Sequence, residues 1–97
     1  MISKIARYKV KPERVEEAKK YVSEFVERVK NNEMGTLVYE AYLLSDGVSF
    51  EHMMTFTDEE AEQIHTSSEY AKQFTAGLYP LCESEPGFET VKRMGVV

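Results

Sequence analysis

The spacing of apolar residues along the chain predicts an α+β fold with the element order β-α-β-β-α-β. Three observations lead to this order. A helix-spaced apolar stripe runs through residues 13–32, two strand-like runs are joined by an Asp-Gly dipeptide, and a second helical region precedes a last strand-like run. Four strands and helices of this length predict one antiparallel sheet with helices on one face.

The first strand is expected over Ile2–Val10 and the first helix over Glu13–Asn32. Pro12 separates them and suits the first turn of a helix, where its missing N–H costs nothing. Apolar residues then recur at three- and four-residue spacing, which predicts one buried helix face. They are Val15, Ala18, Val22, Phe25, Val26 and Val29.

The hairpin is expected from strands Thr36–Ser45 and Ser49–Phe56. Asp46-Gly47 between them predicts a type I′ turn, which needs positive φ at both central residues. The first of these strands is apolar on both faces, so it must be covered on both. Helices of one small chain cover only one face, and we therefore expect a homodimer in which a second subunit covers the other.

The segment after the hairpin contains two capping-box patterns, Thr57 with Glu60 and Thr66 with Glu69. They predict a short helix over residues 58–64 and a longer one over residues 67–84. Pro80 is expected to kink or end the longer helix. A final strand is expected over Phe88–Val96.

This order is that of the ferredoxin-like split βαβ arrangement, and residues 1–97 are expected to form a single domain. The net charge of −5, with acidic and basic residues interspersed, argues against a nucleic acid or an anionic membrane as partner. The single cysteine, Cys82, fits a reducing compartment. With no membrane-spanning run and no signal-peptide pattern, we expect a cytoplasmic protein.

Several residues in this framework resemble the antibiotic biosynthesis monooxygenase (ABM) domain, one of the dimeric α/β-barrel families. The resemblance is carried by Lys11-Pro12, the segment 34–40, Phe56, the acidic run 58–60, His65, Ser68, Tyr70 and Phe74. It implies a homodimer with face-to-face sheets and a pocket between sheet and helices. It also implies oxidation of phenolic or quinol-type polyketides by O2 without metal or flavin.

The chain departs from the family pattern at two positions of the third strand. Phe56 stands where the family usually has Trp, and Met54 replaces a frequent Glu. The haem-degrading branch of the family uses an Asn, a Trp and a His at the positions that match Arg7, Phe56 and Thr75. None of the three is kept, so haem degradation is rejected and no cofactor is expected.

Cofactor-free oxygenation needs a base, a donor for the developing oxyanion and a dry aromatic pocket. Histidine is the natural base at neutral pH. His65, between the two short helices, is a candidate base or substrate partner, or else a residue that caps or packs the helix junction. His52, on the apolar face of the third strand, is a catalytic candidate or a satisfied core histidine. Their spacing does not favour a metal site.

The candidate substrate-binding residues are aromatic or apolar, with one arginine. They are Tyr39, Met54, Phe56, Tyr70, Phe74 and Arg7. The alternative for Phe74 is plain core packing, and for Arg7 an ion pair at an interface or rim.

Two functional hypotheses follow. The first is a cofactor-independent monooxygenase that oxidises a small aromatic quinol or polyketide-like substrate with O2. The alternative is a non-catalytic dimeric α/β-barrel protein that binds a small aromatic or apolar ligand, which the missing Trp and Glu favour. A purely structural interaction domain would have no cavity.

Overall fold

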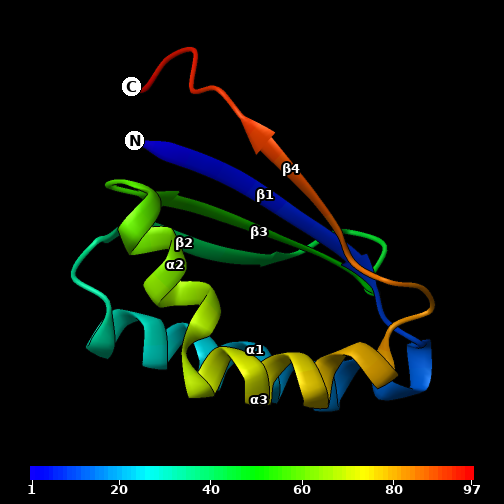
Figure 1. Ribbon diagram of the computed structural model, residues 1–97. Helices are drawn as coiled ribbons and strands as arrows, with labels where there is room; N and C mark the ends of the chain where they lie inside the picture. Colours follow the sequence, from blue (N-terminus) through cyan, green and yellow to red (C-terminus); the bar gives the residue numbers. More distant parts are fainter.

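The computed structural model describes all 97 residues as one four-stranded antiparallel sheet with its helices on one face (Figure 1). The strands are β1 (Ile2–Lys9), β2 (Thr36–Leu43), β3 (Ser49–Phe56) and β4 (Gly87–Val91), in the order β2-β3-β1-β4. The helices are α1 (Val15–Asn32), α2 (Glu59–Ser67) and α3 (Glu69–Leu78), with short 3₁₀ turns η1 (Pro12–Arg14) and η2 (Tyr79–Leu81). This confirms the ferredoxin-like α+β fold. No helix combines the length and apolar character needed to cross a lipid bilayer.

The core lies between the inner face of the sheet and α1 and α3. Of the predicted helix stripe, Val15, Ala18, Val22, Phe25 and Val29 are buried, and Val26 packs against them. From the sheet, alternate residues of β1 and β3 meet this stripe, because successive side chains of a strand point to opposite faces. Tyr8, Phe50 and Phe56 are among the buried side chains that β1 and β3 contribute.

The β2–β3 hairpin forms as predicted, but its turn is not of type I′. Gly47, with φ of 79°, is the one residue with positive φ, so Asp46 does not adopt the left-handed conformation that a type I′ turn requires. The Asp46 carboxylate instead accepts hydrogen bonds from the backbone N–H groups of Val48 and Ser49, at 3.0 and 2.8 Å. Side-chain capping of this kind is a common way for Asp to stabilise a turn.

The helix starts lie one or two residues beyond the predicted positions. Asp58, rather than Thr57, caps α2, and its side chain accepts the N–H of Ala61 at 2.8 Å. Ser68, rather than Thr66, caps α3 through the N–H of Ala71 at 3.2 Å. In each case the residue that caps is the one whose extended backbone turns its side chain back onto the first helical turn.

The last two elements are shorter than predicted. The helix expected over residues 67–84 ends at Leu78, and Pro80 lies in η2, where the chain has already left α-helical geometry. Strand β4 ends at Val91 rather than Val96, because its pairing with β1 runs out at Ser3, close to the start of that strand. Residues 92–97 lie outside the sheet.

The outer face of the sheet, opposite the helices, is not covered by any element of the chain (Figure 1). Val38 and Tyr42 of β2 project from this face, since Tyr39 and Ala41 point toward the helices. Met53 of β3 projects from it too, because its neighbours His52 and Met54 line the cavity on the helical side. Tyr42 is 48% exposed and Met53 is 38% exposed. The predicted apolar character of both faces of β2 is therefore present in the structure.

The position of the α2 cap generates a stability prediction. Replacing Asp58 by Ala leaves the Ala61 N–H without its partner, and we expect the free energy of unfolding to fall by about 1 kcal/mol. Thr57→Ala is the matched control, because Thr57 is exposed and does not cap the helix, and we expect a change of less than about 0.5 kcal/mol. Urea unfolding measures both values. A larger loss in Thr57→Ala than in Asp58→Ala would contradict the cap assignment.

Candidate functional site

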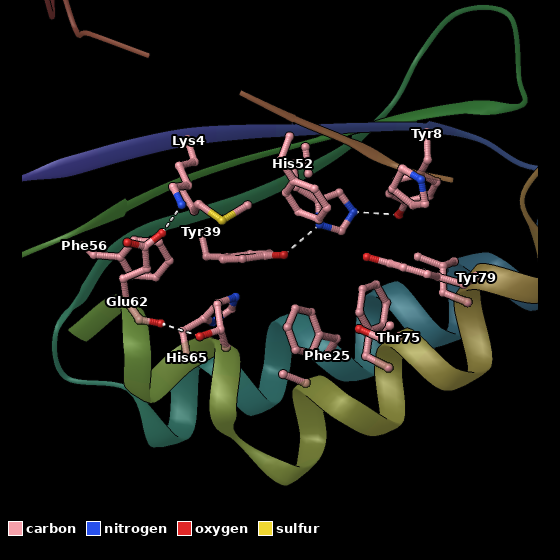
Figure 2. A pocket seen from close by; sticks show the side chains of 18 residues that line it. Lys4, Tyr8, Phe25, Tyr39, His52, Phe56, Glu62, His65, Thr75 and Tyr79 are labelled. Carbon is pink, nitrogen blue, oxygen red and sulfur yellow. Dashed lines mark hydrogen bonds and ion pairs between the residues drawn. The ribbon is translucent and has the colours of Figure 1, made fainter. Parts of the chain in front are cut away.

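A cavity of about 230 Å³ lies between the inner face of the sheet and helices α2 and α3 (Figure 2). Eighteen residues line it, of which 11 are hydrophobic. His52 reaches the cavity from β3 and His65 reaches it from α2, so the two histidines approach from opposite layers. The aromatic rings of Phe25 and Phe74, stacked with centroids 4.2 Å apart, form part of the helical side.

His65 is held in place by a buried carboxylate. Its Nδ1 lies 2.9 and 3.1 Å from the two carboxylate oxygens of Glu33, the residue that follows α1. The carboxylate is the acceptor, so Nδ1 carries the proton. The rings of Phe25 and Phe56 flank the imidazole, with centroids 5.5 and 5.2 Å away.

Glu33 is almost completely removed from solvent, with 2% of its side chain exposed. A buried carboxylate is costly unless hydrogen bonds replace its water shell. Besides His65, the hydroxyl of Tyr70 donates to one oxygen at 2.5 Å and that of Thr36 donates to the other at 2.6 Å. Burial, followed by the hydrogen bond to Glu33, raises the pKa of Tyr70 to about 12, so this hydroxyl remains a donor.

The second nitrogen of His65 is free for a ligand. Nε2 makes no hydrogen bond within the chain, and no fully buried side-chain nitrogen or oxygen lacks a partner. Nε2 is therefore open to the cavity that the residue lines. An imidazole with Nδ1–H on a carboxylate and an unprotonated Nε2 facing a substrate has the arrangement of a general base.

His52 has a different environment. Its Nε2 lies 2.7 Å from the hydroxyl of Tyr8 and its Nδ1 lies 2.8 Å from the hydroxyl of Tyr39. Burial, and then the neighbouring His65, lower the pKa of His52 to about 4, so the ring is neutral at neutral pH. Burial raises the pKa of both tyrosines well above the ordinary value, and both hydroxyls stay protonated.

The structure brings most of the predicted site residues together. Those that line the cavity are His52, His65, Tyr39, Met54, Phe56 and Phe74. Phe74 also packs against the core, which is the alternative role given for it above. Thr75, which matches the histidine position of the haem-degrading branch, lines the cavity as well.

Two predicted substrate-binding residues lie outside the cavity. Arg7 has the opposite strand parity to Ala6 and Tyr8, so it points to the outer face, where its Nε donates to Glu51 at 2.6 Å. This is the ion pair that the alternative interpretation of Arg7 described. Tyr70 does not line the cavity, and its hydroxyl donates to Glu33 while its ring lies 6.1 Å from that of Phe25, measured between centroids.

Sequence reasoning missed Glu33, Tyr8 and an ion pair between Lys4 and Glu62 that lines the cavity. A signal for Glu33 was present, because the helical spacing of the stripe continues from Val29 to position 33. Tyr8 shares strand parity with the apolar residues of β1 and so looked like core. No three His, Cys, Asp or Glu side chains come together as metal ligands would.

Residues 1–77 match the family model described as antibiotic biosynthesis monooxygenase. The chain belongs to this family. No curated protein matches the chain at a significant level.

Solved structures share the ABM fold over nearly the whole chain. A candidate antibiotic biosynthesis monooxygenase from Caulobacter crescentus is 24% identical with a TM-score of 0.88, and the match covers 97% of this chain and 90% of that one. A structure named antibiotic biosynthesis monooxygenase is 19% identical with a TM-score of 0.89, and the match covers 98% of this chain and 100% of that one. A conserved protein from Methanosarcina mazei Go1 is 22% identical with a TM-score of 0.86, covering 95% and 91%. At these identities the structures show a common fold.

The depressed pKa of His52 generates a prediction for stability against pH. The unfolded chain binds a proton on this histidine at a pKa near 6.5, whereas the folded chain binds it only near 4. The unfolded state therefore holds more protons between these values, and stability is lost as the pH falls. We expect this residue alone to lower the free energy of unfolding by roughly 3 kcal/mol between pH 6.5 and 4.

Urea unfolding across this range in the wild type and in His52→Gln measures the effect. Glutamine offers both a donor and an acceptor but does not titrate, so the slope of stability against pH should become shallower in the variant. Equal slopes in the two proteins would contradict the assignment of a neutral buried His52.

Proposed function

We propose that this ABM-family protein is a cofactor-independent monooxygenase that oxidises a small aromatic quinol or polyketide-like substrate with O2. The observation that supports this most is His65, with Nε2 open to the cavity and Nδ1 on the buried Glu33. His65 takes a proton from the substrate, and the carboxylate stabilises the imidazolium that forms. The resulting carbanion or phenolate reduces O2.

The chemistry balances without a further reductant. In an anthrone, the ring methylene loses two hydrogens and becomes a carbonyl, a four-electron oxidation. O2 accepts these four electrons, one oxygen atom enters the new carbonyl and the other leaves as water. The apolar, aromatic lining keeps bulk water from the carbanion and admits a planar ring.

An oxygen-consumption assay tests the proposal. An anthrone prepared anaerobically is mixed with protein and O2, and we expect consumption above the protein-free blank. His65→Gln should lower the rate by roughly 10²–10⁴-fold, because the base is lost. Glu33→Gln should also lower it, because the amide does not stabilise an imidazolium.

Ser67→Ala is the matched control, since Ser67 is exposed on the same helix and does not line the cavity. It should keep the wild-type rate. Consumption equal to the blank across a panel of anthrones and quinols, or an unchanged rate in His65→Gln, would contradict the proposal.

The alternative proposal is a non-catalytic barrel that binds a small apolar ligand. The largely apolar lining, with Met54 and Phe56 at the positions where the family usually has Glu and Trp, favours it. Tight binding of an aromatic ligand with no turnover would select this alternative over the first.

We propose further that two chains associate through their outer sheet faces. The exposed Tyr42 and Met53, with Val38 beside them, support this, because burying apolar surface of this kind drives association. Met53→Lys places a charge on this face, and we expect light scattering to report a single-chain mass for it and twice that mass for the wild type.

The matched control for Met53→Lys is Met34→Lys. Met34 is 98% exposed and lies in the connection between α1 and β2, away from the outer face. It should retain the wild-type mass. A single-chain mass for the wild type at micromolar concentration would contradict the dimer.

A further inference from the structure

Tyr8, His52 and Tyr39 form a continuous hydrogen-bonded chain across three neighbouring strands, β1, β3 and β2. All three side chains line the cavity, and Figure 2 shows the imidazole between the two hydroxyls. Neither tyrosine hydroxyl makes another hydrogen bond to any group of the protein. His65, the base proposed above, does not use these three hydrogen-bonded side chains, so their presence on a largely apolar sheet face requires a separate explanation.

The number of protons shared among the Tyr8, His52 and Tyr39 side chains is fixed. His52 is 2% exposed and has no carboxylate among its hydrogen-bond partners, so a charged ring would be a buried, uncompensated cation. A neutral imidazole has one N–H and one bare nitrogen. One tyrosine therefore donates to the bare nitrogen, and the other accepts from the N–H and keeps its own proton free.

We propose that the Tyr8–His52–Tyr39 chain is an oxyanion-binding element, in which the tyrosine that accepts from His52 donates its free hydroxyl proton to an anionic aryl oxygen of the ligand. This inference rests on the proposed function, because a phenolate or enolate oxygen forms when His65 removes a proton. The tautomer of His52 sets which of Tyr8 and Tyr39 is the donor.

The position of the chain relative to the base supports this assignment. The Tyr39 ring lies 5.6 Å from the His52 ring and 5.5 Å from the His65 ring, measured between centroids, so it adjoins both histidines. A ligand ring in contact with His65 is therefore close to Tyr39, whose hydroxyl lies 2.8 Å from His52 Nδ1. Donors placed in advance where charge develops are a principal source of transition-state stabilisation.

A phenolate that the protein does not oxidise tests the inference separately from turnover. 4-Nitrophenolate, at a pH where it is fully ionised in solution, is bound to the wild type, Tyr8→Phe, Tyr39→Phe and the double variant. Nitrobenzene is the matched neutral probe, because it lacks the anionic oxygen. Calorimetry measures both affinities.

We expect the double variant to bind 4-nitrophenolate roughly 10–100-fold more weakly, the range for a lost hydrogen bond to a charged group, with nitrobenzene binding unchanged. Each single variant should lose less affinity for 4-nitrophenolate than the double variant, because His52 can adopt the tautomer that leaves the remaining hydroxyl free. Equal phenolate binding in the wild type and the double variant would overturn the inference. An equal loss of affinity for 4-nitrophenolate and nitrobenzene would also overturn it, since the tyrosines would then only shape the cavity.

Nitrogen NMR of the protein with ¹⁵N-labelled histidine provides the second readout. In the wild type with 4-nitrophenolate bound, His52 should show one protonated and one bare ring nitrogen. Two protonated nitrogens would overturn the assignment of a neutral His52 with one donating tyrosine, because an imidazolium would donate to both hydroxyls and leave both of their protons free. Absence of anthrone turnover, with these binding results intact, would count against the proposed function alone.

Discussion

The buried carboxylate of Glu33 is the interaction on which the arrangement of the site depends. It receives hydrogen bonds from His65 on α2, Tyr70 on α3 and Thr36 at the start of β2, while its own backbone closes the end of α1. Four elements are thus tied to one charge. A carboxylate with 2% of its side chain exposed is stable only when such donors replace its water shell. The loss of one donor therefore weakens the whole hydrogen-bond network around Glu33.

The two histidines illustrate how one cavity holds the same side chain in two different environments. His65 has a carboxylate on one nitrogen and open space at the other, which suits it to take up a proton. His52 has a tyrosine on each nitrogen and no charge nearby to stabilise an imidazolium, which keeps it neutral. The difference arises from position, because α2 is close to the end of α1 whereas β3 lies at the centre of the sheet.

The fold was predictable from the sequence because periodicity reports burial directly. The stripe from Val15 to Val29 and the alternation in β3 each identified the buried face correctly, and Pro80 marked the end of the last helix. Local details were less predictable, because several residues compete for one role. Thr57 and Asp58 both suit a cap, and only the backbone geometry selects Asp58.

The site was predictable where aromatic residues and histidines lay on a buried strand face. Glu33 and Tyr8 were missed, because their roles depend on partners 32 and 44 residues away in the chain.

We propose that His65 meets the reacting oxygen or carbon of an aromatic ligand inside the cavity. A crystal structure of the protein with a stable phenolic ligand tests this position of the ligand. We expect the ring to lie between the sheet and the Phe25–Phe74 pair, with its hydroxyl within hydrogen-bond distance of His65 Nε2. A ligand bound outside this cavity, or inside it with no polar contact to His65, would contradict the proposed role of His65.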